Sequence, residues 1–188
     1  MLILFSGPIG AGKTTFCQQL AAAARARGVP VAGVLAPAIA QDGQKVGIEA
    51  VDLRSGARRT LARTDRDLGG VRVGPYSFDD QALTWALQRC QEALRGDALA
   101  FVDEIGRLEL ERGEGLAPLL PLLARPRPAH TVVIVRDTLL DELAARVAAA
   151  QPRVVTLQDT KMQELLFEVY RCRTRQKNRT RIPTDETD

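Results

Sequence analysis

The sequence predicts an α/β protein built on one mostly parallel sheet, with helices on both faces and an inserted antiparallel β-meander. Short, almost wholly apolar segments alternate with longer amphipathic segments along most of the chain. Strands that are apolar throughout are buried on both faces, as in parallel sheets covered by helices. Two segments of alternating character, residues 45–53 and 57–63, are joined by the turn sequence RSG. That pattern predicts a hairpin, and therefore the meander.

Each predicted strand is an apolar run bounded by turn residues or by a helix. The first begins close to the amino terminus with LILF, and Pro37 stops the second. Runs of this length and composition favour strands over helices. In chain order the predicted strands cover residues 2–5, 29–37, 45–53, 57–63, 98–103, 131–135 and 153–157.

The predicted helices are recognised by their apolar spacing and their capping residues. Gly28 ends the first helix and Gly96 the second, which Ser77 or Asp79 caps at its start. The apolar stripe predicted for the second helix consists of Phe78, Ala82, Trp85, Leu87 and Leu94. The helices cover residues 13–27, about 79–95, 138–149 and a last segment to about residue 171, and prolines break a further short helix over residues 116–124. Residues 65–77, polar and rich in glycine, are predicted to be a loop.

Charge divides the chain into a neutral body and a basic tail. Residues 171–188 hold six basic and three acidic residues, which accounts for the net charge of +3. We therefore expect one domain, residues 1–171, followed by a disordered tail, residues 172–188. Contact of this tail with nucleic acid or another anionic surface is the alternative.

Several classes of protein are excluded by composition. No apolar run approaches the roughly 20 residues that a membrane span needs, and no secretory signal precedes the first strand. The three cysteines are far apart, and a single histidine leaves no set of Cys and His ligands for a metal. We expect a soluble cytoplasmic protein with reduced thiols, acting as a monomer.

The segment GPIGAGKTT, residues 7–15, predicts a phosphate-binding loop. Gly7, Gly12, Lys13 and Thr14 satisfy the Walker A pattern G-x-x-x-x-G-K-[ST], between a strand and a helix. Glycines let the backbone turn its N–H groups toward phosphate oxygens, and the helix adds its positive end. The residues predicted to bind nucleotide here are Gly7, Pro8, Ile9, Gly10, Ala11, Gly12, Lys13, Thr14 and Thr15.

Particular side chains of this loop have predicted roles. Lys13 is one of four lysines beside 22 arginines. Its ammonium is a point charge that fits between the β- and γ-phosphates, which makes it a candidate catalytic residue. The hydroxyl of Thr14 is a candidate ligand for Mg²⁺, and Thr15 is placed to reach the α-phosphate.

The segment LAFVDEIGRLEL supplies the acidic groups that the phosphate site needs. Asp103 and Glu104 follow an apolar strand, at the sheet edge where ligands of open α/β sheets bind. Asp103 fits the Walker B position beside Mg²⁺, and Glu104 is the candidate for polarising a water molecule. The neighbours predicted to contribute to nucleotide binding are Phe101, Val102, Ile105 and Gly106.

Four blocks of sequence resemble the THEP1-type nucleoside-triphosphatase family. They are GVPVAGVLAP, DGQKVGIEAVDLRSGARRTLAR, VRVGPYSFD and VDEIGRLEL, which follow the phosphate loop in the family's order. The resemblance runs from residue 7 to about residue 166 and so covers most of the chain. It implies a RecA-like P-loop fold with an additional strand in the sheet.

The same resemblance implies Mg²⁺-dependent hydrolysis of ATP, GTP, CTP and UTP to the diphosphate and phosphate, with loose base preference. Residues 7–14, Asp103 and Glu104 match the family's nucleotide, metal and catalytic positions, and Glu109 matches a second glutamate whose task is open. Lys161 and Met162 stand where many relatives carry Asn-Arg.

Arginines near the predicted site have two interpretations. Arg136, at the end of the strand over residues 131–135, is a candidate for contact with the γ-phosphate, and Arg107 is a similar case. Alternatively, Arg136 pairs with a neighbour such as Asp137 or Asp141. Arginines around the hairpin form either a phosphate-binding lid or a solvated face. They are Arg54, Arg58, Arg59, Arg63 and Arg66.

Two other functions share the phosphate loop. A nucleotide or small-molecule kinase would transfer phosphate to an organic acceptor. A nucleotide-dependent regulator would use slow hydrolysis as a timer, with the basic tail docking a partner protein or RNA. The acidic pair at residues 103–104 favours water as the acceptor, so hydrolysis is the principal prediction.

Overall fold

The computed structural model describes residues 1–127, 129–158 and 164. These residues form one sheet of ten strands in the order β10-β1-β9-β8-β2-β4-β5-β7-β6, with β3 beside β4. The strands are β1 Leu2–Gly7, β2 Val31–Leu35, β3 Ala38–Gln41, β4 Gln44–Asp52, β5 Arg58–Arg63, β6 Arg72–Val73, β7 Tyr76–Phe78, β8 Leu99–Ile105, β9 Thr131–Arg136 and β10 Arg153–Thr156. The helices are α1 Lys13–Ala26, α2 Asp80–Arg95, α3 Arg107–Leu110, α4 Leu120–Leu123 and α5 Leu140–Arg146, with short 3₁₀ turns η1 Ala117–Leu119, η2 Asp137–Leu139 and η3 Ala148–Ala150.

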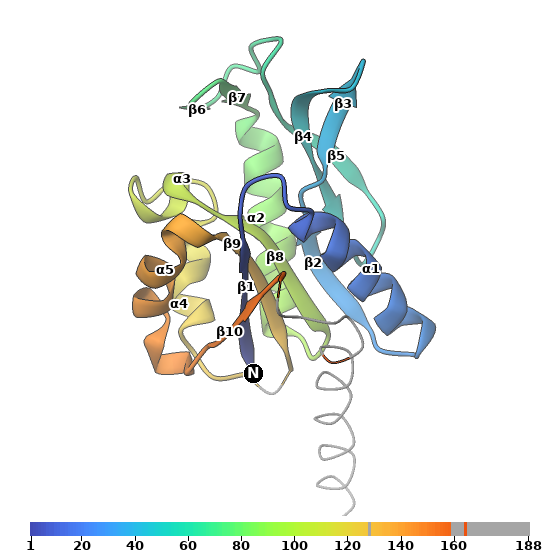
Figure 1. Cartoon of the computed structure of the whole chain (residues 1–188), viewed down its shortest axis with the longest axis vertical. Coiled ribbons are helices and arrows are strands. Elements are labelled where there is room, and N and C mark those ends of the chain that lie inside the picture. Colours follow the sequence, from blue (N-terminus) through green and yellow to red (C-terminus); the bar gives the residue numbers. More distant parts are fainter. Residues whose placement is uncertain (128, 159–163, 165–188) are drawn as a thin grey trace, which may run out of the picture.

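The sheet has a parallel part and an antiparallel part. Strands β10, β1, β9, β8 and β2 pair in parallel. From β2 onward the pairing is antiparallel, and β3, β4 and β5 extend beyond the parallel part with β6 and β7 at their far end (Figure 1). Strand β9 lies between β1 and β8, which is the additional strand of a RecA-like fold. The predicted α/β class and the inserted meander are therefore confirmed.

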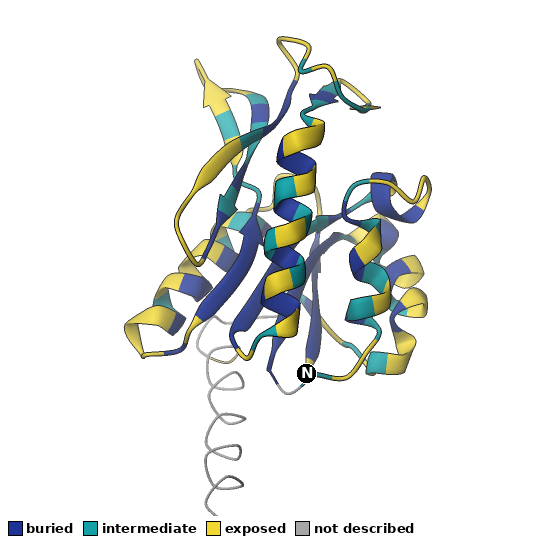
Figure 2. Cartoon of the chain, turned by 180° about the vertical axis from the view of Figure 1, so that it is seen from behind, coloured by how far each residue is buried: buried dark blue, intermediate teal, exposed yellow. Residues whose placement is uncertain are grey.

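Helices cover both faces of the parallel strands. In β1, Ile3 and Phe5 belong to the core beneath α1, whereas Leu2 and Leu4 belong to the core shared with α2, α4 and α5. Figure 2 shows α2 with its buried side against the sheet and its exposed side facing outward. Every residue of β1 is buried, as predicted for a strand with helices on both sides.

Some local predictions were wrong. The predicted loop over residues 65–77 includes β6 and most of β7, which form a hairpin of two- and three-residue strands, too short to leave a period in the sequence. The break that prolines were expected to make in the helix over residues 116–124 is confirmed, since this segment is a 3₁₀ turn followed by the four-residue α4. The tail at 172–188, Lys161, Met162 and all of the predicted last helix except residue 164 lie outside the described residues.

Helix α2 begins at the cap predicted for it but buries a different stripe. The Asp79 carboxylate accepts a hydrogen bond from the backbone N–H of Ala82 at 2.9 Å, so Asp79 rather than Ser77 is the N-cap. Trp85 and Leu87, expected in the stripe, are only half-buried. The residues of α2 that are buried are Ala82, Leu83, Ala86, Cys90, Ala93 and Leu94.

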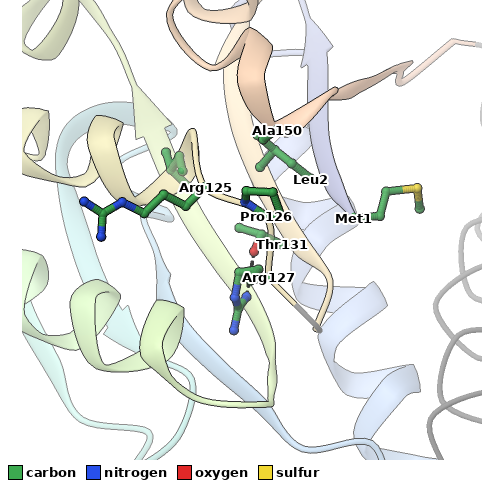
Figure 3. Close-up of a pocket in the computed structure, with 8 residues that line it drawn as sticks. Met1, Leu2, Arg125, Pro126, Arg127, Thr131 and Ala150 are labelled. Carbon is green, nitrogen blue, oxygen red and sulfur yellow. Dashed lines mark hydrogen bonds between the residues drawn. The ribbon is translucent and has the colours of Figure 1, made fainter. Parts of the chain in front are cut away.

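The opposite end of α2 is held by Arg127. Its guanidinium donates hydrogen bonds to the carbonyl oxygens of Ala93 and Gly96 at 2.9 and 2.7 Å. It also donates to the Thr131 hydroxyl at 2.6 Å (Figure 3). A cation at a helix C-terminus satisfies carbonyls that have no helical partner. The pocket beside it lies at the amino-terminal ends of β1 and β9, away from the phosphate loop. It is lined by Met1, Leu2, Leu123, Arg125, Pro126, Arg127, Thr131 and Ala150.

Gly33 allows β2 to approach β8 closely. Its φ angle is 96°, in the left-handed region, and a Cβ added there would collide with the carbonyl oxygen of Phe101. Its own carbonyl accepts a hydrogen bond from the N–H of Leu53 at 2.8 Å, just beyond β4. Gly33 therefore fixes the join between the parallel strands and the meander.

We predict that Gly33→Ala destabilises the fold by about 2–5 kcal/mol, combining about 1–2 kcal/mol of backbone strain with about 1–3 kcal/mol of overpacking. Urea unfolding measures this loss. Gly56→Ala is the matched control, because Gly56 has a φ of 76° and open space around its missing Cβ. It carries only the strain term of about 1–2 kcal/mol. Equal losses in the two variants would contradict the collision with Phe101.

Candidate active site

The phosphate loop connects the carboxyl end of β1 to the start of α1. Gly10 and Gly12 have φ angles of 75° and 92°, in the region that favours glycine. Gly12 is the N-cap of α1, and its backbone carbonyl accepts a hydrogen bond from the N–H of Phe16 at 2.9 Å. The glycines of the motif are thus explained by the turn, which leaves the positive end of a 14-residue helix facing the loop.

Lys13 extends back along the loop. Its side chain is nearly buried, at 8% exposure, and its Nζ donates hydrogen bonds to the carbonyl oxygens of Gly7 and Pro8 at 2.6 and 2.8 Å. The ammonium is therefore already positioned inside the curve of the loop. Of the neighbouring loop residues, Ile9 and Thr15 are exposed, while Thr14 is half-buried.

Asp103 joins the phosphate loop to the end of β8. Its Oδ2 accepts hydrogen bonds from the Thr14 hydroxyl at 2.8 Å and from the backbone N–H of Ala36 at 2.9 Å. Asp103 is 4% exposed, and this burial, together with the charge of Glu104, raises its pKa to about 6. The two hydrogen bonds and the charge of Lys13 act in the opposite direction.

The pair of oxygens on Thr14 and Asp103 suits a small hard cation. Mg²⁺ prefers oxygen ligands and retains several waters or substrate phosphates, so it needs few protein ligands. Among the described residues, no group of three or more His, Cys, Asp or Glu side chains is placed to hold a metal ion. A hydroxyl and a carboxylate 2.8 Å apart at the helix start are the donor set that a nucleotide-bound Mg²⁺ uses.

Glu104 forms an ion pair with Arg136. The Nε of Arg136 lies 2.6 Å from Oε1 of Glu104, and the two side chains are 38% and 32% exposed. In the pairing of β8 with β9, Asp103 faces Ile134 and Ile105 faces Val135, so Glu104 is an additional residue in a β-bulge. Such bulges redirect a side chain. The partner of Arg136 is thus neither Asp137 nor Asp141, which sequence proximity suggested, but a residue on a neighbouring strand.

Glu109, whose task the sequence left open, shapes the segment that follows β8. It is 5% exposed, and its carboxylate accepts hydrogen bonds from the backbone N–H groups of Gly106 at 2.8 Å and Leu116 at 3.1 Å. Burial raises its pKa. Glu109 therefore holds the two ends of the segment from α3 to η1 together. Helix α3 itself was not predicted from the sequence. No sequence signal indicated that Leu116 would return to this carboxylate.

The other predicted residues divide between the core and the surface. Phe101, Val102 and Ile105 are fully buried, so they support the strand that carries Asp103 and Glu104. Gly106 is half-buried at the start of α3. Arg107 pairs with Glu111 at 3.4 Å on the surface.

The arginines of the meander are engaged with neighbours. Arg58 pairs with Glu49 and Arg63 with Asp65, each at 2.6 Å, and the Arg59 guanidinium lies 5.0 Å from the centre of the Trp85 ring. Arg54, Arg58, Arg59 and Arg66 are exposed, whereas Arg63 is buried, so the cluster is not a uniformly solvated face. Within the described residues, no helix is long and apolar enough to cross a membrane.

Comparisons with known proteins agree with this geometry. The family described as NTPase matches residues 2–170. The nucleoside-triphosphatase THEP1 of Methanopyrus kandleri is 32% identical over 132 residues, which is 70% of each chain.

Two solved structures share the fold. The crystal structure of THEP1 from Aquifex aeolicus has a TM-score of 0.67 at 17% identity and covers 90% of this chain and 99% of its own. The solution structure of a human cancer-related nucleoside triphosphatase has a TM-score of 0.64 at 25% identity and covers 92% and 97%. A family match over nearly the whole length, on a RecA-like sheet with the phosphate loop and acidic strand end in contact, leads to one conclusion. The chain belongs to the NTPase family, whose enzymes hydrolyse nucleoside triphosphates.

Proposed function

We propose that the protein is a Mg²⁺-dependent nucleoside-triphosphatase that converts ATP, GTP, CTP and UTP to the diphosphate and phosphate. The observation that carries the proposal is the hydrogen bond between Thr14 and Asp103. It joins the phosphate loop to the acidic strand end, so that binding and hydrolysis share one site. Glu104, next in the chain, is the group assigned to water.

Phosphate binding is assigned to the loop backbone and to Lys13. The backbone N–H groups of residues 10–14 are assigned to the phosphate oxygens, and the start of α1 adds positive potential there. Without nucleotide, the N–H of Ala11 donates to the carbonyl oxygen of Pro8 at 3.3 Å. Lys13 now donates to two carbonyl oxygens, and phosphate oxygens carry more negative charge than those carbonyls. We expect the ammonium to transfer its hydrogen bonds to the β- and γ-phosphates when nucleotide binds.

Thr14 and Asp103 would hold the metal ion. When bound, Mg²⁺ supplies positive charge that offsets the charge developing on the transferred phosphoryl group. Asp103 would remain anchored by the backbone N–H of Ala36, which leaves its position independent of the metal. The Thr14 hydroxyl would turn from Asp103 toward the ion.

Glu104 would accept a hydrogen bond from the attacking water and orient it. The water oxygen forms a bond to the γ-phosphorus as one of its protons passes to Glu104, and the bond from that phosphorus to the bridging oxygen breaks, which releases the diphosphate. Most of the rate enhancement then comes from position and charge stabilisation. Glu104 is suited to this role because its side chain is only partly buried, at the same sheet edge as the loop.

Loose base preference and a cytoplasmic location complete the proposal. The assigned groups all act on phosphates, metal and water, and none of them reads a base. Cys17 and Cys90 are buried free thiols, which suits a reducing compartment. We further propose that the protein acts as a monomer.

Replacement of Lys13 tests phosphate binding. We predict that Lys13→Ala loses measurable binding of Mg²⁺-ATP and Mg²⁺-ADP by titration calorimetry, because both ligands need the ammonium in the loop. Lys45→Ala, which removes an ammonium on β4 that lies 5.4 Å from the Tyr76 ring, is the control and should bind normally. Normal binding by Lys13→Ala would rule out the assigned phosphate site.

Replacement of Glu104 tests the water-orienting role. We predict that Glu104→Gln still binds nucleotide but releases phosphate about 100-fold more slowly or worse, since it no longer orients water as a base would. Glu111→Gln, on the exposed end of α3, should retain the parent rate. The assay uses ATP, GTP, CTP and UTP, each with and without Mg²⁺. A normal rate for Glu104→Gln would refute the role.

The buried carboxylate of Asp103 predicts a pH-dependent stability. Because its pKa rises from 3.8 to about 6, the folded protein binds this proton more tightly than the unfolded chain does. Its contribution to stability therefore falls as pH rises from about 4 to 6 and stays low above that range. In metal-free protein, Asp103→Asn should raise the free energy of unfolding by up to about 3 kcal/mol at pH 8, with the gain disappearing near pH 4.

Urea unfolding at both pH values, with a chelator present, measures this difference. The amide oxygen of asparagine can still accept from Thr14 and Ala36, so the substitution preserves the local geometry. A gain of the same size at pH 4 and pH 8 would show that protonation of Asp103 is not its source.

A further inference from the structure

The ion pair of Glu104 with Arg136 engages the carboxylate that hydrolysis requires. One oxygen of Glu104 accepts from the Nε of Arg136 at 2.6 Å. A carboxylate held in this way has its charge offset by the guanidinium, which makes it a weaker acceptor for the proton of a water molecule. Because this bond uses Nε, it does not engage the two terminal amino groups of the guanidinium, which carry four of its five N–H donors.

The order of the strands places Arg136 between the two halves of the site. It is the last residue of β9, which lies between β1 and β8. In the register of the sheet, Arg136 pairs with Gly7, the first residue of the phosphate loop. On the other side, the end of β9 pairs with β8 around the bulge that contains Glu104. The backbone of Arg136 thus lies beside the start of the loop, and its guanidinium contacts the carboxylate assigned to water.

The ion pair is open to exchange. At 38% and 32% exposure, both side chains remain in contact with solvent, and an ion pair of this kind contributes little to folding. An arginine stays charged at every physiological pH, so its guanidinium pairs with the nearest anion. In the protein without nucleotide that anion is Glu104. A γ-phosphate in the loop would bring a second, more highly charged anion with oxygens suited to a guanidinium.

We propose that Arg136 exchanges partners when a triphosphate binds, and this inference rests on the proposed function. Without a γ-phosphate, Arg136 holds Glu104. With a γ-phosphate in the loop, Arg136 contacts it and releases the carboxylate to orient water. A diphosphate does not reach far enough to draw Arg136 away. Arg136 therefore distinguishes the substrate from the product and couples that distinction to the readiness of Glu104.

A double-mutant cycle tests the exchange through binding. The four chains are the parent, Glu104→Gln, Arg136→Gln and the double variant. The probes are the β,γ-imido analogue of ATP and ADP, each with Mg²⁺, and the readout is Kd by calorimetry. Coupling between groups that compete for one partner is typically about 5- to 150-fold. Arg89→Gln is the matched control, since Arg89 pairs with Glu92 at the same 2.6 Å on α2 with similar exposure.

The expected result has three parts. Glu104→Gln binds the triphosphate analogue about tenfold more tightly than the parent, because a neutral amide holds Arg136 less strongly than a carboxylate does. Arg136→Gln binds it about tenfold more weakly, and the double variant shows no gain over Arg136→Gln. Affinity for ADP stays within about twofold in all four chains and in Arg89→Gln, because neither side chain contacts the diphosphate.

Other outcomes overturn the exchange. If Glu104→Gln tightens triphosphate binding even when Arg136 is replaced, the gain comes from removing a negative charge near the phosphate, without any exchange. If Arg136→Gln weakens both nucleotides equally, Arg136 does not distinguish them. Should Arg136→Gln fail to fold, Arg136→Met, which keeps the aliphatic stem, replaces it in the same cycle. Failure of the parent chain to bind either nucleotide would instead overturn the proposed function itself.

Discussion

The buried carboxylate of Asp103 is the constraint on which the rest of the site depends. This carboxylate accepts hydrogen bonds from the Thr14 hydroxyl on α1 and from the backbone N–H of Ala36, just after β2. It therefore connects β8 to two elements that are distant in the sequence. A carboxylate in such surroundings is stable only if its oxygens are satisfied by donors, which these elements supply. Its pKa is still raised, because burial outweighs these hydrogen bonds. Folding thus keeps the carboxylate in a place where a metal ion improves its environment.

The strand order distributes the chemistry along a single edge of the sheet. The phosphate loop follows β1, Arg136 ends β9, and Asp103 and Glu104 lie at the end of β8. These three strands are adjacent and parallel. The ammonium of Lys13, the guanidinium of Arg136 and the two carboxylates therefore lie at the same edge of the sheet. The bulge in β8 gives its two carboxylates different surroundings: Asp103 is buried and Glu104 is partly exposed. The site is therefore assembled from the ends of neighbouring strands, without a long inserted loop.

How far the site could be predicted depended on the range of the interactions. The loop at residues 7–15 and the acidic pair at 103–104 were predicted because glycine turns and apolar strands leave local patterns. The predicted partner of Arg136 was wrong. Proximity in the sequence suggested Asp137 or Asp141, whereas the sheet brings Glu104 to Arg136. The task of Glu109 and the anchor from Ala36 could not be predicted either, because both depend on backbone groups that a distant segment delivers.

The anchor from Ala36 has a consequence for how such sites diverge. Its donor belongs to the main chain, so every residue type except proline can provide it at that position. The side chain there is free to change during evolution without loss of the contact. A substitution there would consequently change the sequence and still retain the hydrogen bond. In a fold of this kind, sequence variability and structural dispensability are separate properties, and only coordinates can tell them apart.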